Sequence, residues 1–440
     1  MALWRRDAHD REILRLALPA FGALAAEPLY VLADTAIVGH LGRDPLAGLA
    51  VAGALLSVVF GIFNFLAYAT TAAVARRIGA GDRKKAAEQG IDGLWLALGL
   101  GIAMTALGLA VAPAVVSAMG ASHRIRPDAL TYLRISLLGS PAVLIALAGT
   151  GYLRGCQDTR TPLAIEVAAN VGNLGLELLL VFGLHLGIAG SAWGTVIAQV
   201  GAALAYLAIV KRAAHAEHAS LRPDRVGIRA AAVVGSHLVV RTGSLLVAFT
   251  VSTAVATRIG DAPVAAHEVA FEIWNFLALS LDAIAIAGQA IVGQSLGAGD
   301  TVGARASARR MIEWGVLAGI VLGALVALTS PLLAAAFTHD HSVRNATLPI
   351  LLVVAIMQPM NGVVFVLDGV LIGAGETAYL ALAMLAATFV FVPAAILVHT
   401  LGGGLVALWG ALTLFMVARL VGMGARYLGD HWLVIGAARS

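Results

Sequence analysis

Long apolar stretches separated by short polar ones run along the whole of this sequence. Windows such as 94–116, 137–152 and 316–333 contain no charged residue. A membrane-spanning helix needs about 20 apolar residues, whereas the strands of a membrane barrel give short alternating segments. The pattern therefore predicts α-helices that cross a lipid bilayer.

Twelve stretches of this kind are predicted to be helices: 13–39, 44–76, 90–115, 127–152, 162–184, 188–211, 228–258, 263–295, 313–336, 348–372, 377–399 and 404–427. The polar, basic stretch 211–229, which contains Pro223, separates six helices from six. We expect a first lobe at 1–211, a cytoplasmic linker at 212–227 and a second lobe at 228–440.

An internal repeat supports this division. Gly79-Ala80-Gly81-Asp82 recurs as Gly297-Ala298-Gly299-Asp300, so position 79 maps onto 297, a displacement of 218. The same displacement relates Pro113 to Pro331 and Pro141 to Pro359. Because each copy has an even number of helices, both enter the membrane from the same side and are parallel repeats. The predicted fold is all-α, with twelve transmembrane helices in two six-helix lobes and a cleft between them. We expect the repeated glycines and prolines to serve helix packing and turns.

The distribution of charge predicts the orientation. Only 12% of the residues are charged, 60% are hydrophobic, and the formal net charge is +4. The 29 Lys and Arg residues concentrate in every second loop; the exceptions are Arg43, Arg124, Arg126, Arg134, Arg258 and Arg344. The positive-inside rule then places both termini in the cytoplasm of a multi-pass plasma-membrane protein. Topology explains the basic residues, so nucleic acid is not an expected partner. The charged segment 1–11 is followed by a long span without a clear cleavage site, so a removable signal peptide is not expected.

Several classes of chemistry lack their sequence signatures. Cys156 is the one cysteine, so disulfide and redox chemistry are not expected. No HExxH or paired acidic metal motif occurs, and none of the three lysines lies in a phosphate-binding loop. The sequence predicts a protein that is neither an enzyme nor an ATPase and that carries no cofactor or resident metal.

Polar side chains inside the predicted spans form two stripes in the first half. Ionisable groups in a bilayer cost several kcal/mol unless they are paired or solvated, so these positions are informative. On helix 13–39 the spacing of three and four residues puts one set on a single face: Glu27, Tyr30 and Asp34. On helix 162–184 the spacing is four, three, four: Glu166, Asn170, Asn173 and Glu177.

Asp34 and Glu177 lie at similar depths, about 8–11 Å from the outer ends of their helices at 1.5 Å per residue. We therefore expect them to share a site. Two carboxyls with amide partners can hold a proton or a small cation, because like charges and desolvation oppose double ionisation. Structural hydrogen bonding between helices is the alternative, although the free energy needed to bury acids favours a functional role.

The second half has its own polar face on helix 263–295: Glu268, Glu272, Asn275, Asp282 and Gln289. Asp368 adds an acid on helix 348–372. Contact with a transported compound and helix–helix hydrogen bonding are both open for this set. At displacement 218, Asp34, Asn173 and Glu177 correspond to Ser252, Phe391 and Ala395. The repeat thus predicts ion coupling in the first half.

Several longer motifs resemble those of one known family. They are Ala17-Leu18-Pro19-Ala20, the run 32–42 (LADTAIVGHLG), the run 170–177 (NVGNLGLE), Leu281-Asp282-Ala283, the run 293–298 (GQSLGA) and the run 367–374 (LDGVLIGA). Together they resemble the multidrug and toxic compound extrusion (MATE) family of the MOP superfamily, in its DinF-like branch. The resemblance implies a V-shaped cavity between the lobes that opens to alternate sides and exports cationic or amphipathic compounds in exchange for protons or sodium.

The same resemblance implies roles for single residues. The family's coupling aspartate matches Asp34, its asparagine Asn173, its threonine Thr195, and its kink-forming proline Pro19. Tyr30 matches a cavity tyrosine. The family commonly has aspartate where this chain has Glu177, and proton binding tolerates the longer side chain better than tight cation coordination does.

The resulting hypothesis is a monomeric, proton-coupled antiporter for small amphipathic or cationic compounds, xenobiotics among them. The expected ion-coupling residues are Asp34, Asn170, Asn173, Glu177 and Thr195. The expected cavity residues are Glu27, Tyr30, Glu272, Asn275, Asp282 and Asp368, with Pro19 as the hinge. The alternatives are sodium coupling, with Na⁺ at Asp34, Asn173, Glu177 and Thr195, and a flippase for an amphipathic or lipid-linked molecule.

Overall fold

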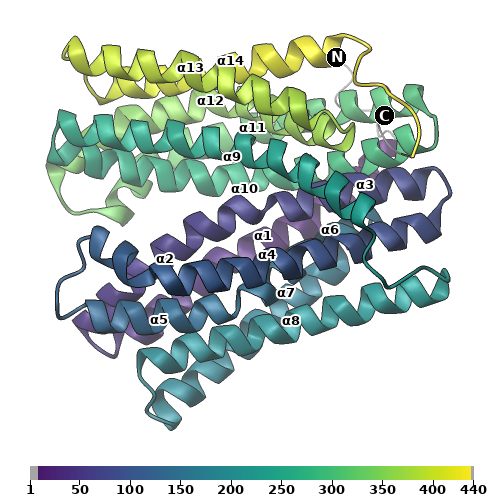
Figure 1. The fold of residues 1–440 in the computed structure, drawn as a ribbon. Helices are drawn as coiled ribbons and strands as arrows, with labels where there is room; N and C mark the ends of the chain where they lie inside the picture. Colours follow the sequence, from purple (N-terminus) through teal and green to yellow (C-terminus); the bar gives the residue numbers. More distant parts are fainter. Residues whose placement is uncertain (1–7, 438–440) are drawn as a thin grey trace. The chain divides into compact units, whose positions relative to one another are not determined.

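A computed structural model describes residues 8–437, and within that range helices follow one another through short loops (Figure 1). The α-helices are α1 (Ala8–Gly39), α2 (Arg43–Phe63), α3 (Phe65–Gly79), α4 (Arg83–Ala118), α5 (Arg126–Leu138), α6 (Ser140–Gly155), α7 (Arg160–Glu177), α8 (Ile188–Ala216), α9 (Arg225–Ile259), α10 (Asp261–Gly297), α11 (Thr301–Phe337), α12 (His341–Gly373), α13 (Thr377–Thr400) and α14 (Leu405–Leu428). A π-helical turn, η1 (Leu178–Gly183), continues α7. Arg5, Arg6 and Arg439, which belong to the predicted cytoplasmic charge, lie outside the described residues.

The all-α membrane fold is confirmed. Eleven spans of the described chain are long and apolar enough to cross a membrane, and the pair α5–α6, bent by 49°, makes a twelfth. Two of the predicted spans are interrupted. The α5–α6 break is followed by Pro141, which lacks the N–H that a continuous helix would need. At Asn64, between α2 and α3, the N–H bonds to the carbonyl of Gly61, three residues back.

The chain forms two compact units, each described by itself. The N-unit is Gly22–Gly235, and the C-unit combines the described chain up to Phe21 with the described chain from Ser236 onward. Two helices are therefore shared. The first part of α1 belongs to the C-unit and the rest to the N-unit, while α9 starts in the N-unit and continues in the C-unit. The lobe boundaries predicted at 211 and 228 divide the chain in sequence order. They do not include the assignment of the start of α1 to the C-unit and of the start of α9 to the N-unit.

The repeat appears as equivalent backbone contacts inside each unit. In the N-unit a Cβ at Gly151 would lie 2.5 Å from the carbonyl oxygen of Ala67. In the C-unit a Cβ at Gly369 would lie 2.3 Å from the carbonyl oxygen of Ala285, and both residues are displaced by 218 from the first pair. Glycine is required at these crossings because a side chain would meet the neighbouring backbone. The packing role expected for the repeated glycines is confirmed at these positions.

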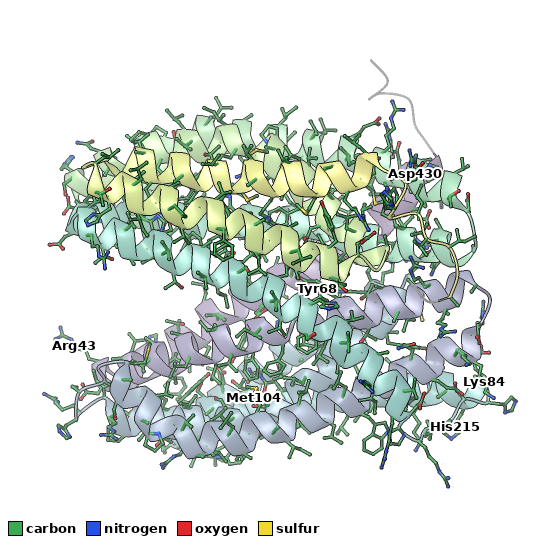
Figure 2. The ribbon with its side chains drawn as sticks, turned by 45° about the horizontal axis from the view of Figure 1, so that its top comes forward. Arg43, Tyr68, Lys84, Met104, His215 and Asp430 are labelled. Carbon is green, nitrogen blue, oxygen red and sulfur yellow. The ribbon has the colours of Figure 1, made fainter. Side chains whose placement is uncertain are left out.

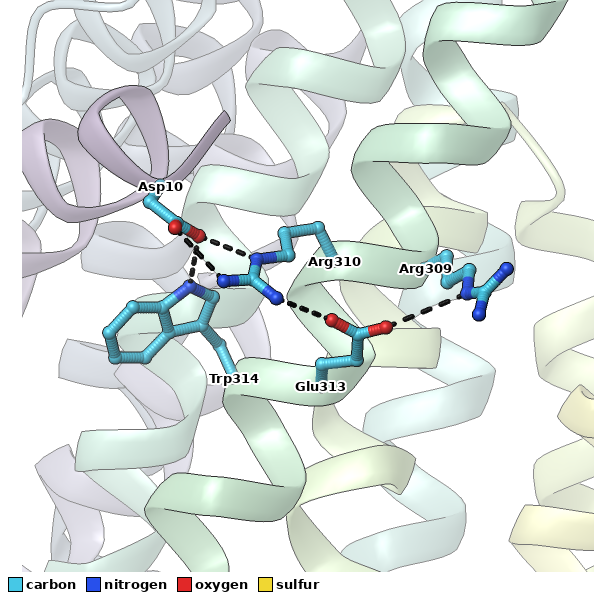
Figure 3. A network of polar contacts seen from close by, with 5 residues as sticks. All are labelled: Asp10, Arg309, Arg310, Glu313 and Trp314. Atoms are coloured by element: carbon cyan, nitrogen blue, oxygen red, sulfur yellow. Dashed lines mark hydrogen bonds and ion pairs between the residues drawn. The ribbon is translucent and has the colours of Figure 1, made fainter. Parts of the chain in front are cut away.

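A network of polar contacts fixes the start of α1 within the C-unit (Figure 3). Asp10 accepts hydrogen bonds from Nε and Nη2 of Arg310, at 2.6 and 2.9 Å, and from Nε1 of Trp314 at 2.8 Å. Arg310 also donates to Glu313 at 2.6 Å, and Glu313 pairs with Arg309. A carboxylate that accepts three hydrogen bonds from α11 holds the first turn of α1 in place.

The corresponding position of the first repeat anchors α9 in the same way. Position 310 lies 218 beyond Asp92 on α4, and Asp92 accepts a hydrogen bond of 2.9 Å from the backbone N–H of Asp224, directly before α9. Trp95 donates to the carbonyl of Leu221 at 3.1 Å. The first helix of each repeat thus starts against the third helix of the other repeat. Figure 2 shows Lys84 and His215 at one end of the N-unit and Arg43 at the opposite end.

Replacing Gly369 by alanine is expected to destabilise the protein. The new Cβ would collide with the Ala285 carbonyl, and overpacking of this kind typically costs about 1–3 kcal/mol. The midpoint of thermal unfolding of the purified protein should fall. Gly410→Ala in α14 is the matched control, because nothing lies within 4 Å of its added Cβ. Equal midpoints for the two variants would contradict the packing role of Gly369.

Asp10→Asn is expected to loosen the start of α1. The change removes the charge from three hydrogen bonds, and a hydrogen bond to a charged group is worth about 1.5–3 kcal/mol. Thermal unfolding should begin at a lower temperature than in Asp430→Asn, where the pair with Arg305 is exposed and exposed ion pairs contribute about 0–1 kcal/mol. The same loss in both variants would show that the Asp10 network is no stronger than a surface pair.

Candidate functional site

The end of α7 shapes the candidate site in the N-unit. At Glu177 the α-helix changes into the π-helical turn η1, a geometry that is frequent at functional sites. Gly194 of α8 faces this end: a Cβ there would lie 3.0 Å from Cγ of Glu177 and 3.1 Å from Oδ1 of Asn173. The missing side chain lets α7 and α8 approach closely enough for their polar groups to meet.

Asp34 of α1 lies in this polar group and is 5% exposed. Its Oδ1 accepts a hydrogen bond from the hydroxyl of Ser191 at 2.6 Å, and its Oδ2 accepts from the hydroxyl of Tyr132 at 3.4 Å. The carboxyls of Asp34 and Glu177 lie close enough for their charges to interact. The structure thus brings together the two acids that the sequence places at similar depth.

Glu177 is fully buried. Its Oε1 accepts hydrogen bonds from the hydroxyl of Tyr30 at 2.8 Å and from that of Thr195 at 3.5 Å. Thr195 also bonds to Tyr30 at 2.8 Å and accepts from Nδ2 of Asn173 at 3.3 Å. Oε2 of Glu177 and Oδ1 of Asn173 are buried without a hydrogen-bond partner. Two buried oxygen acceptors are therefore left for a proton or a cation.

The donors to the two carboxyls are hydroxyl groups, and the amide of Asn173 donates to one of these hydroxyls. All of these groups are neutral. Two adjacent carboxylates in such a place repel each other and lose their hydration, so a state with both ionised is disfavoured. The arrangement is chemically suited to exchange a positive charge with water. The described residues contain no group of three His, Cys, Asp or Glu side chains placed to hold a metal ion.

Other residues of the predicted set lie apart from this cluster. Asn170 donates instead to the backbone carbonyl of Ala26 in α1 at 3.3 Å. Glu166 accepts from Tyr206 at 3.5 Å, and Glu27 is exposed on the N-unit. The polar stripe of α7 is therefore divided: only its last two members, Asn173 and Glu177, belong to the cluster that contains Asp34.

In the C-unit, Glu272 and Asn275 are exposed and Asp282 is half-buried. Asp368 is buried and forms an ion pair with Arg241 of α9. Phe391, which corresponds to Asn173, packs edge-on against Phe415 with ring centroids 5.8 Å apart. The second repeat has therefore replaced the polar group with aromatic packing at this position.

Sequence reasoning missed two residues of the cluster. Ser191 precedes Thr195 by four residues and so shares its helix face, a spacing that could have identified it. Tyr132 comes from α5, the first half of the bent span, and no spacing links it to Asp34. Its position depends on a bend that the apolar pattern does not record.

Comparison with known proteins identifies the family of this chain. The family model MatE matches residues 19–179 and 242–397, most of the chain. The chain belongs to the MatE family. The resemblance stated from sequence motifs is thus confirmed, and as a member of this family the protein is a multi-pass membrane transporter and not an enzyme.

Relatives of this MatE protein extend over nearly its whole length. "Protein DETOXIFICATION 44, chloroplastic" of Arabidopsis thaliana is 35% identical over 97% of this chain and 84% of its own. "DNA damage-inducible protein F" of Escherichia coli K12 is 29% identical over 96% of this chain and 93% of its own, which supports the DinF-like branch. A MOP superfamily transporter from Pyrococcus furiosus shares the fold, with a TM-score of 0.87, 23% identity and 97% coverage of both chains.

Gly194→Ala is expected to impair transport while the protein stays folded. The added Cβ would push Glu177 and Asn173 away from their partners, and misplacing a reacting group by about 1 Å can cost about 10²-fold in rate. Efflux should be measured with a panel of fluorescent cationic and amphipathic dyes. Gly172→Ala on α7, where an added Cβ meets nothing within 4 Å, should transport normally. Normal efflux in both variants would show that the position of Glu177 is not important for transport.

Proposed function

We propose that this MatE protein is a proton-coupled antiporter that exports small amphipathic or cationic compounds by alternating access. The observation that carries the proposal is the buried pair Asp34 and Glu177, whose donors are all neutral. Relatives named for multidrug resistance and detoxification support the substrate class. We infer a monomer in the plasma membrane, with both termini in the cytoplasm as the positive-inside rule predicts.

The transport cycle begins with proton binding. When Asp34 is protonated, its repulsion with Glu177 disappears, and its contacts to Ser191 and Tyr132 rearrange because a neutral carboxyl also donates a hydrogen bond. The rearranged contacts bend α1, and the bending of α1 releases the bound substrate. Loss of the proton to the cytoplasm restores the original contacts and resets the protein.

Pro19 gives α1 a place to bend. Proline lacks the N–H that would bond to the carbonyl four residues earlier, so a helix bends there at low cost. The residue lies between the Asp10 network, which fixes the start of the helix, and Asp34 nearer its end. A change at Asp34 therefore acts on a helix that is fixed at its start by Asp10 and that can bend at Pro19.

Sodium coupling is the nearest alternative. Oε2 of Glu177 and Oδ1 of Asn173 are unbonded oxygens, and with Asp34 and Thr195 they form the donor set that a hard cation prefers. A proton needs no such full coordination shell. We favour the proton because the longer Glu177 side chain suits proton exchange.

A flippase would need a polar groove for a lipid headgroup. The N-unit has a groove of about 630 Å³ along α7 and α8, and its walls are small and apolar side chains such as Ala168, Ala198 and Gly201. Arg160 and Thr161 line it at the start of α7. An apolar groove of this kind gives no support to headgroup transport.

Asp34→Asn is expected to abolish efflux driven by a pH gradient in proteoliposomes, because asparagine cannot bind and release a proton. Glu177→Gln should reduce it strongly, since it removes one of the paired charges. Asp44→Asn is the matched control: Asp44 pairs with exposed Arg124 at the start of α2. Full efflux by Asp34→Asn would refute the proposal.

Replacing sodium by choline on both sides of the membrane is expected to leave pH-driven efflux unchanged. The proposed exchange uses protons alone, so the sodium gradient supplies no driving force. The same proteoliposomes and dye serve for the measurement. Loss of efflux in choline, with recovery when sodium is added, would show that the coupling ion at these residues is Na⁺ and not a proton.

A further inference from the structure

Two arginines and one aspartate lie near one another in the interior of the C-unit. Arg241 is on α9, Asp368 on α12 and Arg419 on α14, and Asp368 and Arg419 are 4% and 3% exposed. Nε of Arg241 donates to Oδ1 of Asp368 at 3.0 Å, and its Nη2 donates to Oδ2. Both oxygens of the carboxylate are thus engaged by the same guanidinium.

Arg419 is poorly satisfied by comparison. Its Nη1 donates to the sulfur of Met416 at 3.4 Å, a weak acceptor, and its Nε is buried without a hydrogen-bond partner. The aromatic rings of Phe365 and Phe415 lie 5.9 and 5.8 Å from its guanidinium carbon. The negative charge of Asp368 favours the positive charge of Arg419, whereas that of Arg241 disfavours it. Asp368 is already bound at both oxygens to Arg241.

Packing does not require this cluster. At displacement 218 the positions of Arg241, Asp368 and Arg419 are held by Ala23, Thr150 and Gly201. The first repeat builds the same frame with small and neutral side chains there. An ionised arginine in a membrane interior is expensive and is a functional candidate unless fully paired.

The surroundings fit an anionic group with an apolar body. Guanidinium groups match carboxylates in shape and charge, and the two phenylalanine rings offer apolar walls. Asn361, which is 1% exposed, lies on the same face of α12 as Phe365 and Asp368, by spacings of four and three. Neither its amide nitrogen nor its amide oxygen has a partner, so it offers a further neutral donor.

We propose that Arg241 and Arg419 form a binding site for the anionic group of a transported compound, with a carboxylate as the preferred class. Asp368 occupies Arg241 between transport cycles and competes with that group. This inference rests on the proposed function, because it gives the C-unit a share in binding the transported compound. It adds anionic amphipathic compounds to the expected substrates.

Thermal unfolding of the full-length protein in lipid nanodiscs tests the site without any ion gradient. The probes are benzoate, benzylammonium and chloride, at constant ionic strength. Benzoate should raise the unfolding midpoint and benzylammonium should not. If chloride raised the unfolding midpoint as much as benzoate did, and replacement of Arg419 abolished that rise, the ligand of this site would be a small inorganic anion.

Two variants should change benzoate binding in opposite directions. Arg419→Gln should weaken it about tenfold or more, the value of one charged hydrogen bond. Asp368→Asn should strengthen it, because the internal competitor is gone; the ligand-free midpoint falls while the benzoate-induced rise grows. Arg305→Gln, in an exposed pair with Asp430, is the control and should bind benzoate normally.

The outcome that would overturn the proposal is a benzoate response that Arg419→Gln leaves unchanged. Stabilisation by benzylammonium that is lost in Asp368→Asn would also overturn it, since Asp368 would then bind cations. Because no proton gradient is involved, these results are independent of Asp34. Failure of proton coupling and failure of the anion site are therefore distinguishable.

Discussion

The free-energy cost of placing carboxyl groups in a lipid environment is the constraint on which this structure depends. Asp34 and Glu177 are nearly inaccessible, and hydroxyls and an amide surround them instead of arginine or lysine. Such a pair is stable when it shares a positive charge taken from water. In the proposed cycle, exchange of that charge between two states of the protein couples an ion gradient to transport. The rest of the fold places these groups and connects them to a helix that can bend.

The repeat supplies the frame for this arrangement. Glycines such as Gly151 and Gly369 let helix backbones cross at equivalent places in the two units. Inside the frame the copies differ: the N-unit has the carboxyl pair, whereas the C-unit has aromatic packing at Phe391 and an arginine-rich cluster around Asp368. One packing scheme thus supports two different charge arrangements, one suited to an ion and the other to an anionic group.

Periodicity and spacing predicted a large part of this from the sequence. The twelve apolar spans and the meeting of Asp34 with Glu177 follow from patterns along single helices. The displacement of 218 follows from motifs that recur in the two halves of the chain. Contacts between helices that no such pattern relates could not be predicted. Tyr132 reaches Asp34 from a bent span, Arg241 pairs with Asp368 across two helices, and α1 begins in the other unit through Asp10. No linear spacing relates these residues, because tertiary packing selects them.

Infrared difference spectroscopy of the protein in lipid vesicles, between alkaline and acidic pH, tests the central claim most directly. A protonated carboxyl in a dry site has a C=O stretching band distinct from that of a carboxylate. The account predicts that acidification in the absence of sodium produces this band and that Asp34→Asn or Glu177→Gln diminishes it, whereas Asp44→Asn leaves it intact. A band that is unchanged in both variants would show that the pair does not exchange a proton and would contradict the account.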